Sequence, residues 1–260
     1  MTTSHLDIYE ELYSFSVDID WAPDFMIESM AHVFIENRIK CTWFVTHDSP
    51  AVRALGDNSL FELGIHPNFL PGSTHGKTED EVIEHCLRLV PGARSVRTHA
   101  LYQNSNLLWR LRNKFDLRVD CSLFLPYTPQ IIPHTLCHSA ADIPLVRIPF
   151  FWEDDVECLR PDRQWNIHDF RFSLKGLKMF NFHPLYVGLN ETDFSRYMRV
   201  KGELCINQSL NQLSEKDLAP FVMHGPGVGS FFRELISDTA LHRRRVMNAS
   251  EIATLYLQSL

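Results

Sequence analysis

YSFSVDID, residues 13–20, alternates between apolar and polar side chains along its whole length. Successive side chains of a β-strand point to opposite faces, so this period of two predicts a strand with one apolar and one polar face. Asp18 and Asp20 are two residues apart and are expected to project from the same polar face, near the C-terminal end of the strand. The stretch therefore predicts a strand that presents two carboxylates at one end.

The rest of the chain alternates between strand-like and helix-like stretches. We expect further strands at 41–48, 61–66, 94–99, 116–123, 143–151, 177–183 and 219–224, and helices at 24–39, 79–90, 104–115 and 250–258. This alternation is typical of an α/β domain. No linker interrupts it, so we expect a single domain over residues 1–260, folded as one distorted β/α barrel of seven or eight strands. An open, doubly wound sheet is the alternative, because periodicity does not show whether a sheet closes.

Composition excludes several classes of partner. The chain of 260 residues is 45% hydrophobic and carries a formal net charge of −7, which argues against nucleic acid or an anionic membrane as the main partner. The N-terminus lacks the features of a signal peptide, and we find no apolar span of about 18 residues that would insert into a membrane. Six cysteines without a C-x-x-C pair predict free, buried, reduced thiols and a cytoplasmic location. Nothing in the sequence indicates the oligomeric state.

Histidines surround a loop rich in Pro, Gly and Ser in ELGIHPNFLPGSTHG, residues 62–76. The carboxyl ends of the strands of a β/α barrel meet at one mouth, where His66 and Asp20 are both expected. The loop can return His75 to the same mouth. One carboxylate and two imidazoles form a typical zinc site when water completes the tetrahedron. Asp20, His66 and His75 are therefore the predicted ligands of a divalent metal, with Zn²⁺ favoured and Co, Ni or Fe compatible with the same donors.

Other expected strands also end in polar side chains. Arg97 and His99 share the polar face of RSVRTH, and His183 ends MFNFH. The segment FWEDD, residues 151–155, combines an aromatic ring that could stack on a sugar with carboxylates that could accept hydrogen bonds from its hydroxyls. His134 and His138 are four residues apart, but Pro precedes them and no amphipathic helix surrounds them, so we interpret them as loop residues.

Five of these stretches resemble, in the same order, the motifs of the NodB-type polysaccharide deacetylases, whose fold is that of the family-four carbohydrate esterases. FSVDID, CTWFV, ELGIHPNF, VRTH and FNFHP carry this resemblance, which covers roughly residues 13–184. HPNF, WEDD and FNFHP are similar to a divergent bacterial subgroup associated with surface-polysaccharide gene clusters. The resemblance implies that Asp18 is the general base, that Asp20 and His66 bind metal, that Arg97 orients the base, and that His183 is the general acid.

The chain departs from the family pattern at two places. The family places its second metal-binding histidine four residues after the first, where this chain has Leu70, so His75 is expected to take that role across a longer loop. Arg97 is followed by Thr98 and His99 instead of x-Pro-Tyr, so we expect a different groove wall. His99, Trp152 and Asp154 are the predicted substrate contacts.

The predicted function is a metal-dependent hydrolase. It would remove an N-acyl group, with acetyl the expected one, from an amino sugar or a surface-polysaccharide precursor, which makes a carbohydrate the expected partner. One alternative is a deformylase or another hydrolase of C–N amide bonds in a small metabolite. A non-catalytic carbohydrate-binding barrel is the other alternative.

Overall fold

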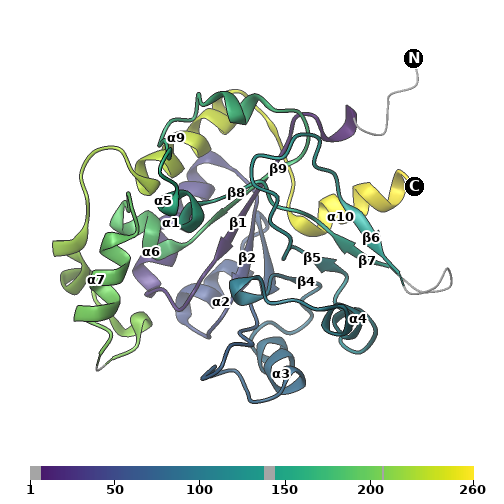
Figure 1. Cartoon of the computed structure of the whole chain (residues 1–260), viewed down its shortest axis with the longest axis horizontal. Coiled ribbons are helices and arrows are strands. Elements are labelled where there is room, and N and C mark those ends of the chain that lie inside the picture. The colour runs from purple at the N-terminus through teal and green to yellow at the C-terminus, as the bar shows by residue number, and fades with distance from the viewer. Residues whose placement is uncertain (1–6, 138–143, 207) are drawn as a thin grey trace.

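A computed structural model describes residues 7–137, 144–206 and 208–260 of the chain (Figure 1). Its strands are β1 (Leu12–Asp18), β2 (Cys41–Val45), β3 (Phe61–Ile65), β4 (Ser95–Val96), β5 (Val119–Asp120), β6 (His134–Leu136), β7 (Leu145–Arg147), β8 (Trp152–Glu153), β9 (Lys178–Phe182) and β10 (Arg245–Val246). Its α-helices are α1 (Asp24–Asn37), α2 (Pro50–Gly56), α3 (Glu79–Leu89), α4 (Ser105–Asn113), α5 (Asp154–Leu159), α6 (Pro184–Leu189), α7 (Ser195–Glu203), α8 (Glu215–Leu218), α9 (Val228–Leu241) and α10 (Ala249–Gln258). No helix in these segments combines the length and apolar character needed to cross a bilayer.

The strands form one curled sheet in the order β6-β7-β5-β4-β3-β2-β1-β9-β8, with β10 paired to β1. Apart from the antiparallel β6–β7 pair, neighbouring strands are parallel. Residues 148–151 connect β7 to β8, which lies at the other end of this order. The amide of Ile148 donates to Asp120 O at 2.9 Å, and that of Phe151 donates to Met179 O at 2.8 Å. This crossing segment curls the sheet and confirms the distorted barrel over an open, doubly wound sheet.

β1 runs through the middle of the sheet, and all seven of its residues are buried (Figure 1). Its apolar side chains pack outward against helices, as the contact between the rings of Phe15 and Phe34 of α1 shows, with centroids 6.0 Å apart. Its polar side chains face the inside of the curl, where the Ser16 hydroxyl donates to Asn181 Oδ1 on β9 at 2.9 Å. The predicted alternation of side chains along β1 therefore places apolar residues in the outer layer and polar residues in the barrel interior.

Most of the expected elements form, with shorter strands than predicted. The expected strand at 219–224 is wrong, because Ala219–Phe221 is a 3₁₀ turn. Phe221 packs with Leu218 of α8 and Leu185 of α6 in a small second core, and a short apolar run of this kind does not distinguish a strand from a helical turn. The sequence patterns also did not predict α2, α5, α6, α7, α8 or α9.

The six cysteines are all free, as expected, but not all buried. Four are buried, whereas Cys137 is exposed and Cys205 is half-buried. His134 belongs to β6 and not to a loop, while His138 lies outside the described residues.

Candidate active site

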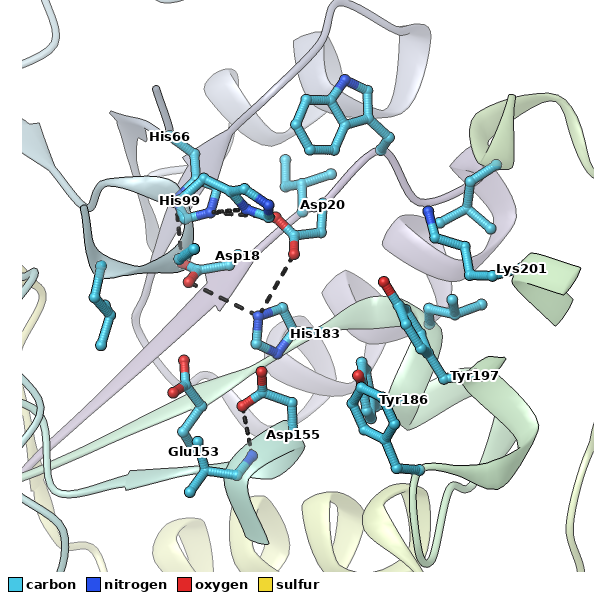
Figure 2. A pocket seen from close by; sticks show the side chains of 18 of the residues that line it. Asp18, Asp20, His66, His99, Glu153, Asp155, His183, Tyr186, Tyr197 and Lys201 are labelled. Atoms are coloured by element: carbon cyan, nitrogen blue, oxygen red, sulfur yellow. Dashed lines mark hydrogen bonds and ion pairs between the residues drawn. The ribbon is translucent and has the colours of Figure 1, made fainter. Parts of the chain in front are cut away.

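A pocket of about 370 Å³ opens at the carboxyl ends of β1, β3 and β9 (Figure 2). Polar side chains from these strands form one side of it, and aromatic side chains from α6 and α7 form another. The lining includes Asp18, Asp20, Trp21, His66, His99, Glu153, Asp155, His183, Tyr186, Phe194, Tyr197 and Lys201. Parallel strands gather their carboxyl ends at one mouth, which explains why residues so far apart in sequence meet there.

Asp20 reaches the pocket from a tight turn and not from the strand itself. β1 ends at Asp18, and the amide of Ala22 donates to Ile19 O at 2.9 Å. The two residues between, Asp20 and Trp21, have φ of 44° and 56°, a left-handed conformation that costs free energy in residues with a Cβ. Strain of this kind is common at functional sites, and here it places the carboxylate of Asp20 over the ends of the strands.

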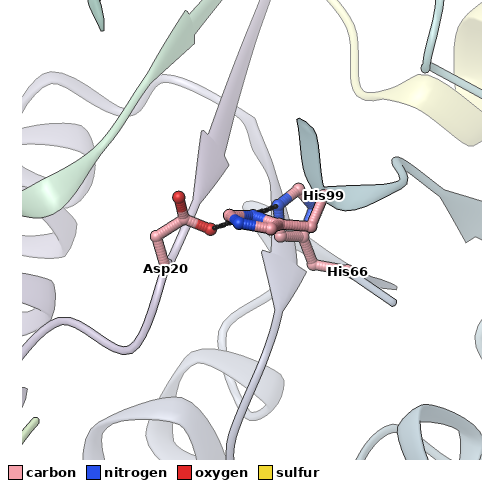
Figure 3. A group of neighbouring side chains, drawn as sticks. All are labelled: Asp20, His66 and His99. Carbon is pink, nitrogen blue, oxygen red and sulfur yellow. Dashed lines mark hydrogen bonds and ion pairs between the residues drawn. The ribbon is translucent and has the colours of Figure 1, made fainter. Parts of the chain in front are cut away.

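Asp20, His66 and His99 bring three potential metal-ligating atoms together (Figure 3). Asp20 Oδ1 lies 3.2 Å from His66 Nε2 and 3.1 Å from His99 Nδ1, and the two imidazole nitrogens are 3.3 Å apart. Ligands about 2.0–2.1 Å from a tetrahedral zinc ion stand about 3.3 Å from one another. The donor set and its spacing therefore fit a divalent transition metal, with one face left open toward the pocket.

The electrostatics of this group match its geometry. Burial opposes ionisation of Asp20, but hydrogen bonds from His66 and His99 outweigh burial and hold the pKa of the carboxyl well below its usual range. Burial likewise disfavours a charged His99 ring, yet the hydrogen bond and charge of Asp20 raise the pKa of that imidazole. A carboxylate thus attracts positive charge at the point where the three ligand atoms converge.

The structure does not bring His75 into this group, which corrects the expected ligand set. His75 Nε2 donates to Thr46 O at 2.8 Å, and His75 Nδ1 accepts from the amide of Asn68 at 3.2 Å. Nε2 therefore joins the loop 67–77 to the residue that follows β2, and Nδ1 makes a hydrogen bond within the loop. His99, expected to contact substrate, occupies the place that the sequence analysis gave to His75.

Asp18 and Arg97 form a buried pair under the pocket. Arg97 Nη1 donates to Asp18 Oδ1 at 3.1 Å, and Arg97 Nε donates to Cys121 O at 2.9 Å. The guanidinium lies between the rings of Phe44 and Phe150, with its central carbon 4.7 and 4.5 Å from their centroids. A planar cation held in this way fixes the orientation of the carboxylate. The geometry agrees with the expected orienting role of Arg97.

Asn181 completes the support of Asp18 from β9. Its Nδ2 donates to Asp18 Oδ2 at 3.0 Å and to Glu153 Oε1 at 2.9 Å. Its Oδ1 accepts from the hydroxyl of Ser16 and from Arg97 Nη1. Both oxygens of Asp18 thus accept a hydrogen bond, one from Arg97 and one from Asn181. Burial raises the pKa of Glu153 well above its usual range.

His183 follows β9 and faces the same pocket. Its Nδ1 lies 2.6 Å from Asp154 Oδ1, and its Nε2 lies 3.9 Å from Asp18 Oδ2 and 3.8 Å from Asp20 Oδ2. Burial disfavours the imidazolium, but the charge and hydrogen bond of Asp154 outweigh burial and raise the pKa of His183 well above its usual range. The ring is therefore held with Nε2 facing the reaction space, in surroundings that favour the imidazolium.

Trp152 and Asp154 do not have the positions expected of substrate contacts. Trp152 is 1% exposed and packs against Phe182 and Phe231, with ring centroids 5.1 and 4.9 Å away. Asp154 is fully buried and supports His183 from behind, through both the ring and the backbone amide. In the same segment, Glu153 and Asp155 are the residues that line the pocket. Because α5 begins at Asp154, consecutive side chains of this segment point in different directions: Glu153 and Asp155 line the pocket, and Asp154 is buried behind His183.

Several pocket residues were not among the predicted ones. Asn181 could have been found, because it lies two residues before His183 on the same face of a strand. Tyr186 and Tyr197 could not, because nothing in the sequence of α6 and α7 indicates that these short helices fold over the mouth of the barrel.

The chain is similar to proteins of one deacetylase family. A family model described as WbmS-like polysaccharide deacetylase matches residues 15–201. The crystal structure of the Bordetella bronchiseptica protein WbmS, described as a candidate polysaccharide deacetylase involved in O-antigen biosynthesis, has 29% sequence identity and a TM-score of 0.75, covering 92% of this chain and 95% of that one. BA3943, a CE4-family pseudoenzyme from Bacillus anthracis, has 10% identity and a TM-score of 0.48, covering 94% of this chain and 66% of that one. No curated protein matches significantly.

Proposed function

Because the chain belongs to the family of WbmS-like polysaccharide deacetylases, we propose that it is a metal-dependent hydrolase that removes an acetyl group from the nitrogen of an amino sugar in a surface-polysaccharide precursor. The observation that carries this proposal is the convergence of Asp20, His66 and His99, with ligand atoms 3.1–3.3 Å apart, beside Asp18 and His183. The O-antigen role described for the similar Bordetella protein supports the choice of substrate class.

Asp20, His66 and His99 would hold the divalent cation, with Zn²⁺ favoured by two imidazoles and one carboxylate. When bound, such a cation polarises the acyl carbonyl and favours ionisation of the attacking water. His66 Nδ1 is buried, makes no hydrogen bond among the described residues, and lies 3.9 Å from Asp18 Oδ1. A carboxylate near the second nitrogen of a ligating imidazole orients the ring, as is common around metal sites.

Asp18 is the proposed general base. It would take a proton from the water as the water oxygen bonds to the acyl carbon. Arg97 and Asn181 hold the two oxygens of this carboxylate, so that its orientation is set before substrate arrives. Preorganisation of this kind lowers the barrier because no reorganisation is needed during the reaction.

His183 is the proposed general acid. It would give the proton on Nε2 to the sugar nitrogen as the C–N bond breaks, so that the nitrogen leaves as a neutral amine and the acyl group leaves as a carboxylic acid. Asp154 holds the ring through Nδ1 and keeps Nε2 directed at the pocket. Protonation matters here because an amide nitrogen leaves poorly as an anion.

Metal content and acetate release test the proposal together. The purified protein should carry about one equivalent of zinc or a similar metal by mass spectrometry and should release acetate from N-acetylated amino sugars. His99→Ala should lose both metal and activity. His75→Gln, the matched control, should keep the metal, because both ring nitrogens of His75 are bound to the backbone.

Different results would favour the alternatives. Full metal content with no acetate from the N-acetylated sugars, but formate from an N-formylated amine, would indicate a deformylase. Sugar binding without hydrolysis in the metal-loaded protein would indicate a carbohydrate-binding barrel. Metal retained in His99→Ala but lost in His75→Gln would refute the ligand set.

A further inference from the structure

Three hydrogen-bond donors line the side of the pocket formed by α6 and α7. Figure 2 shows Tyr186, Tyr197 and Lys201 along this side, across the pocket from Asp20 and His183. The rings of Tyr186 and Tyr197 are stacked, with centroids 5.2 Å apart and planes inclined by 22°. Lys201 Nζ lies 5.7 Å from the centroid of the Tyr197 ring. We call these three residues the donor wall.

The donors of this wall have no partner among the described residues. Neither phenol oxygen makes a hydrogen bond there, and no carboxylate forms an ion pair with Lys201. Tyr186 is 5% exposed as a whole residue, but its hydroxyl oxygen is not among the buried side-chain atoms that lack a partner, so it is accessible from the pocket. The Tyr186 hydroxyl therefore faces a space in which a ligand atom would be its natural acceptor.

The opposite side of the pocket carries the reverse chemistry. Asp18, Asp20, Glu153 and Asp155 line it and supply carboxyl oxygens. Among the described residues that line the pocket, Lys201 is the only lysine or arginine. Away from the proposed metal ligands, an acidic substituent would find an ammonium and two hydroxyls in the donor wall, which could receive it.

We propose that the donor wall binds an anionic group, a carboxylate or a phosphate, carried by the amino-sugar substrate. This inference rests on the proposed deacetylase function and specifies its substrate class. The acyl group would lie between Asp18 and His183, and the charged substituent would point to α7. A volume of about 370 Å³ is in the range of small-molecule sites, which suits one acylated sugar with its charged substituent.

Binding of three probes to the metal-loaded protein, measured by calorimetry, tests this inference. N-acetylglucosamine is neutral, N-acetylglucosaminuronic acid carries a carboxylate, and UDP-N-acetylglucosamine carries a diphosphate. We expect at least one anionic probe to bind about 10-fold or more tightly than the neutral sugar. Preference for the uronic acid would identify a sugar acid, and preference for the UDP-sugar would identify a nucleotide-linked precursor.

Two variants and one control locate the effect. Lys201→Met should remove most of the preference for the anionic probe and leave binding of the neutral sugar unchanged. Tyr197→Phe should weaken the anionic probe without loss of ring stacking. Lys216→Met, the matched control, removes a lysine of α8 that does not line the pocket, so it should preserve the preference.

The donor wall and the deacetylase proposal fail in different ways. Equal binding of all probes, preference retained in Lys201→Met, or no binding of any probe would overturn the donor wall. Acetate released from the neutral sugar, without any preference for charge, would leave the deacetylase standing. A Lys201-dependent preference with no acetate released would instead refute the deacetylase and leave the donor wall standing.

Discussion

Asn181 uses every hydrogen-bonding position of its side-chain amide. Its nitrogen donates to Asp18 and Glu153, and its oxygen accepts from Ser16 and Arg97. An amide has two donors and two lone pairs, so no other orientation of this side chain satisfies the network. We therefore interpret Asn181 as a positioning residue that sets the orientation of the proposed base.

Asn181→Ala should lower kcat about 10- to 100-fold with metal content and KM unchanged, because one oxygen of Asp18 loses its donor. Steady-state kinetics on the N-acetylated sugar, with metal analysis, measures this. Ser16→Ala is the matched control, since it removes a partner of Asn181 without touching Asp18, and its effect should be small. Equal losses in both variants would contradict the positioning role.

Asp154→Asn should also lower the rate of amide hydrolysis, by about 10- to 100-fold. The neutral amide no longer stabilises a protonated His183, which the leaving nitrogen requires. Hydrolysis of p-nitrophenyl acetate should change little, because its leaving group departs without a proton. Parallel assays with the amide and the ester measure the difference. A similar loss on both substrates would show that Asp154 supports the fold of the site and not proton transfer.

At the scale of elements, a sequence motif predicts local structure best when all of its interacting residues lie within a few positions of one another. Thr78 and Glu81 form a capping box at the start of α3, with the Thr78 hydroxyl accepting from the amide of Glu81 and the Glu81 carboxylate accepting from the amide of Thr78. The turn after β1 is less evident in the sequence: aspartate adopts the left-handed conformation of Asp20 more readily than most residues, but the identity of Trp21 does not indicate it.

Thr78→Ala should lower the free energy of unfolding by about 1 kcal/mol, because it removes the N-cap of α3. Chemical denaturation measures this, and kcat should not change. Thr254→Ala is the matched control, because Thr254 is an exposed residue within α10 and does not cap a helix. A loss in Thr254→Ala as large as that in Thr78→Ala would argue against the cap.

At the scale of the whole molecule, His75 links the stability of the fold to pH. Burial lowers the pKa of His75 from the usual 6.5 to about 4. The unfolded chain therefore binds more protons than the native one between these two values. Stability from the neutral, buried ring is fully present above pH 6.5 and is lost as the pH falls toward 4.

His75→Gln should remove this part of the pH dependence, which amounts to at most about 1.4 kcal/mol per pH unit for one group. The difference in unfolding free energy between the native chain and the variant should be largest above pH 6.5 and shrink toward pH 4. Denaturation at a series of pH values measures it. His32→Gln, at an exposed position, should keep the dependence of the native chain. A constant difference across the range would contradict the assignment.

From the sequence we could predict the α/β class, the course of β1, and the meeting of Asp18, Asp20, His66 and His183 at one mouth. This was possible because a strand's period of two and the common edge of parallel strands are local and general rules.

The identity of the second histidine beside Asp20 and His66 follows from long-range packing and could not be read from the sequence. His75 is closer to His66 in the sequence, but its ring nitrogens are taken by backbone groups of Thr46 and Asn68. His99 begins the 3₁₀ turn that follows β4, and its Nδ1 converges with the ligand atoms of Asp20 and His66. Long-range packing also buries Trp152 in the hydrophobic core. It likewise forms the donor wall, because α6 and α7 fold back over the pocket. Such choices depend on long-range packing and on which polar groups are already satisfied, and no local pattern records either.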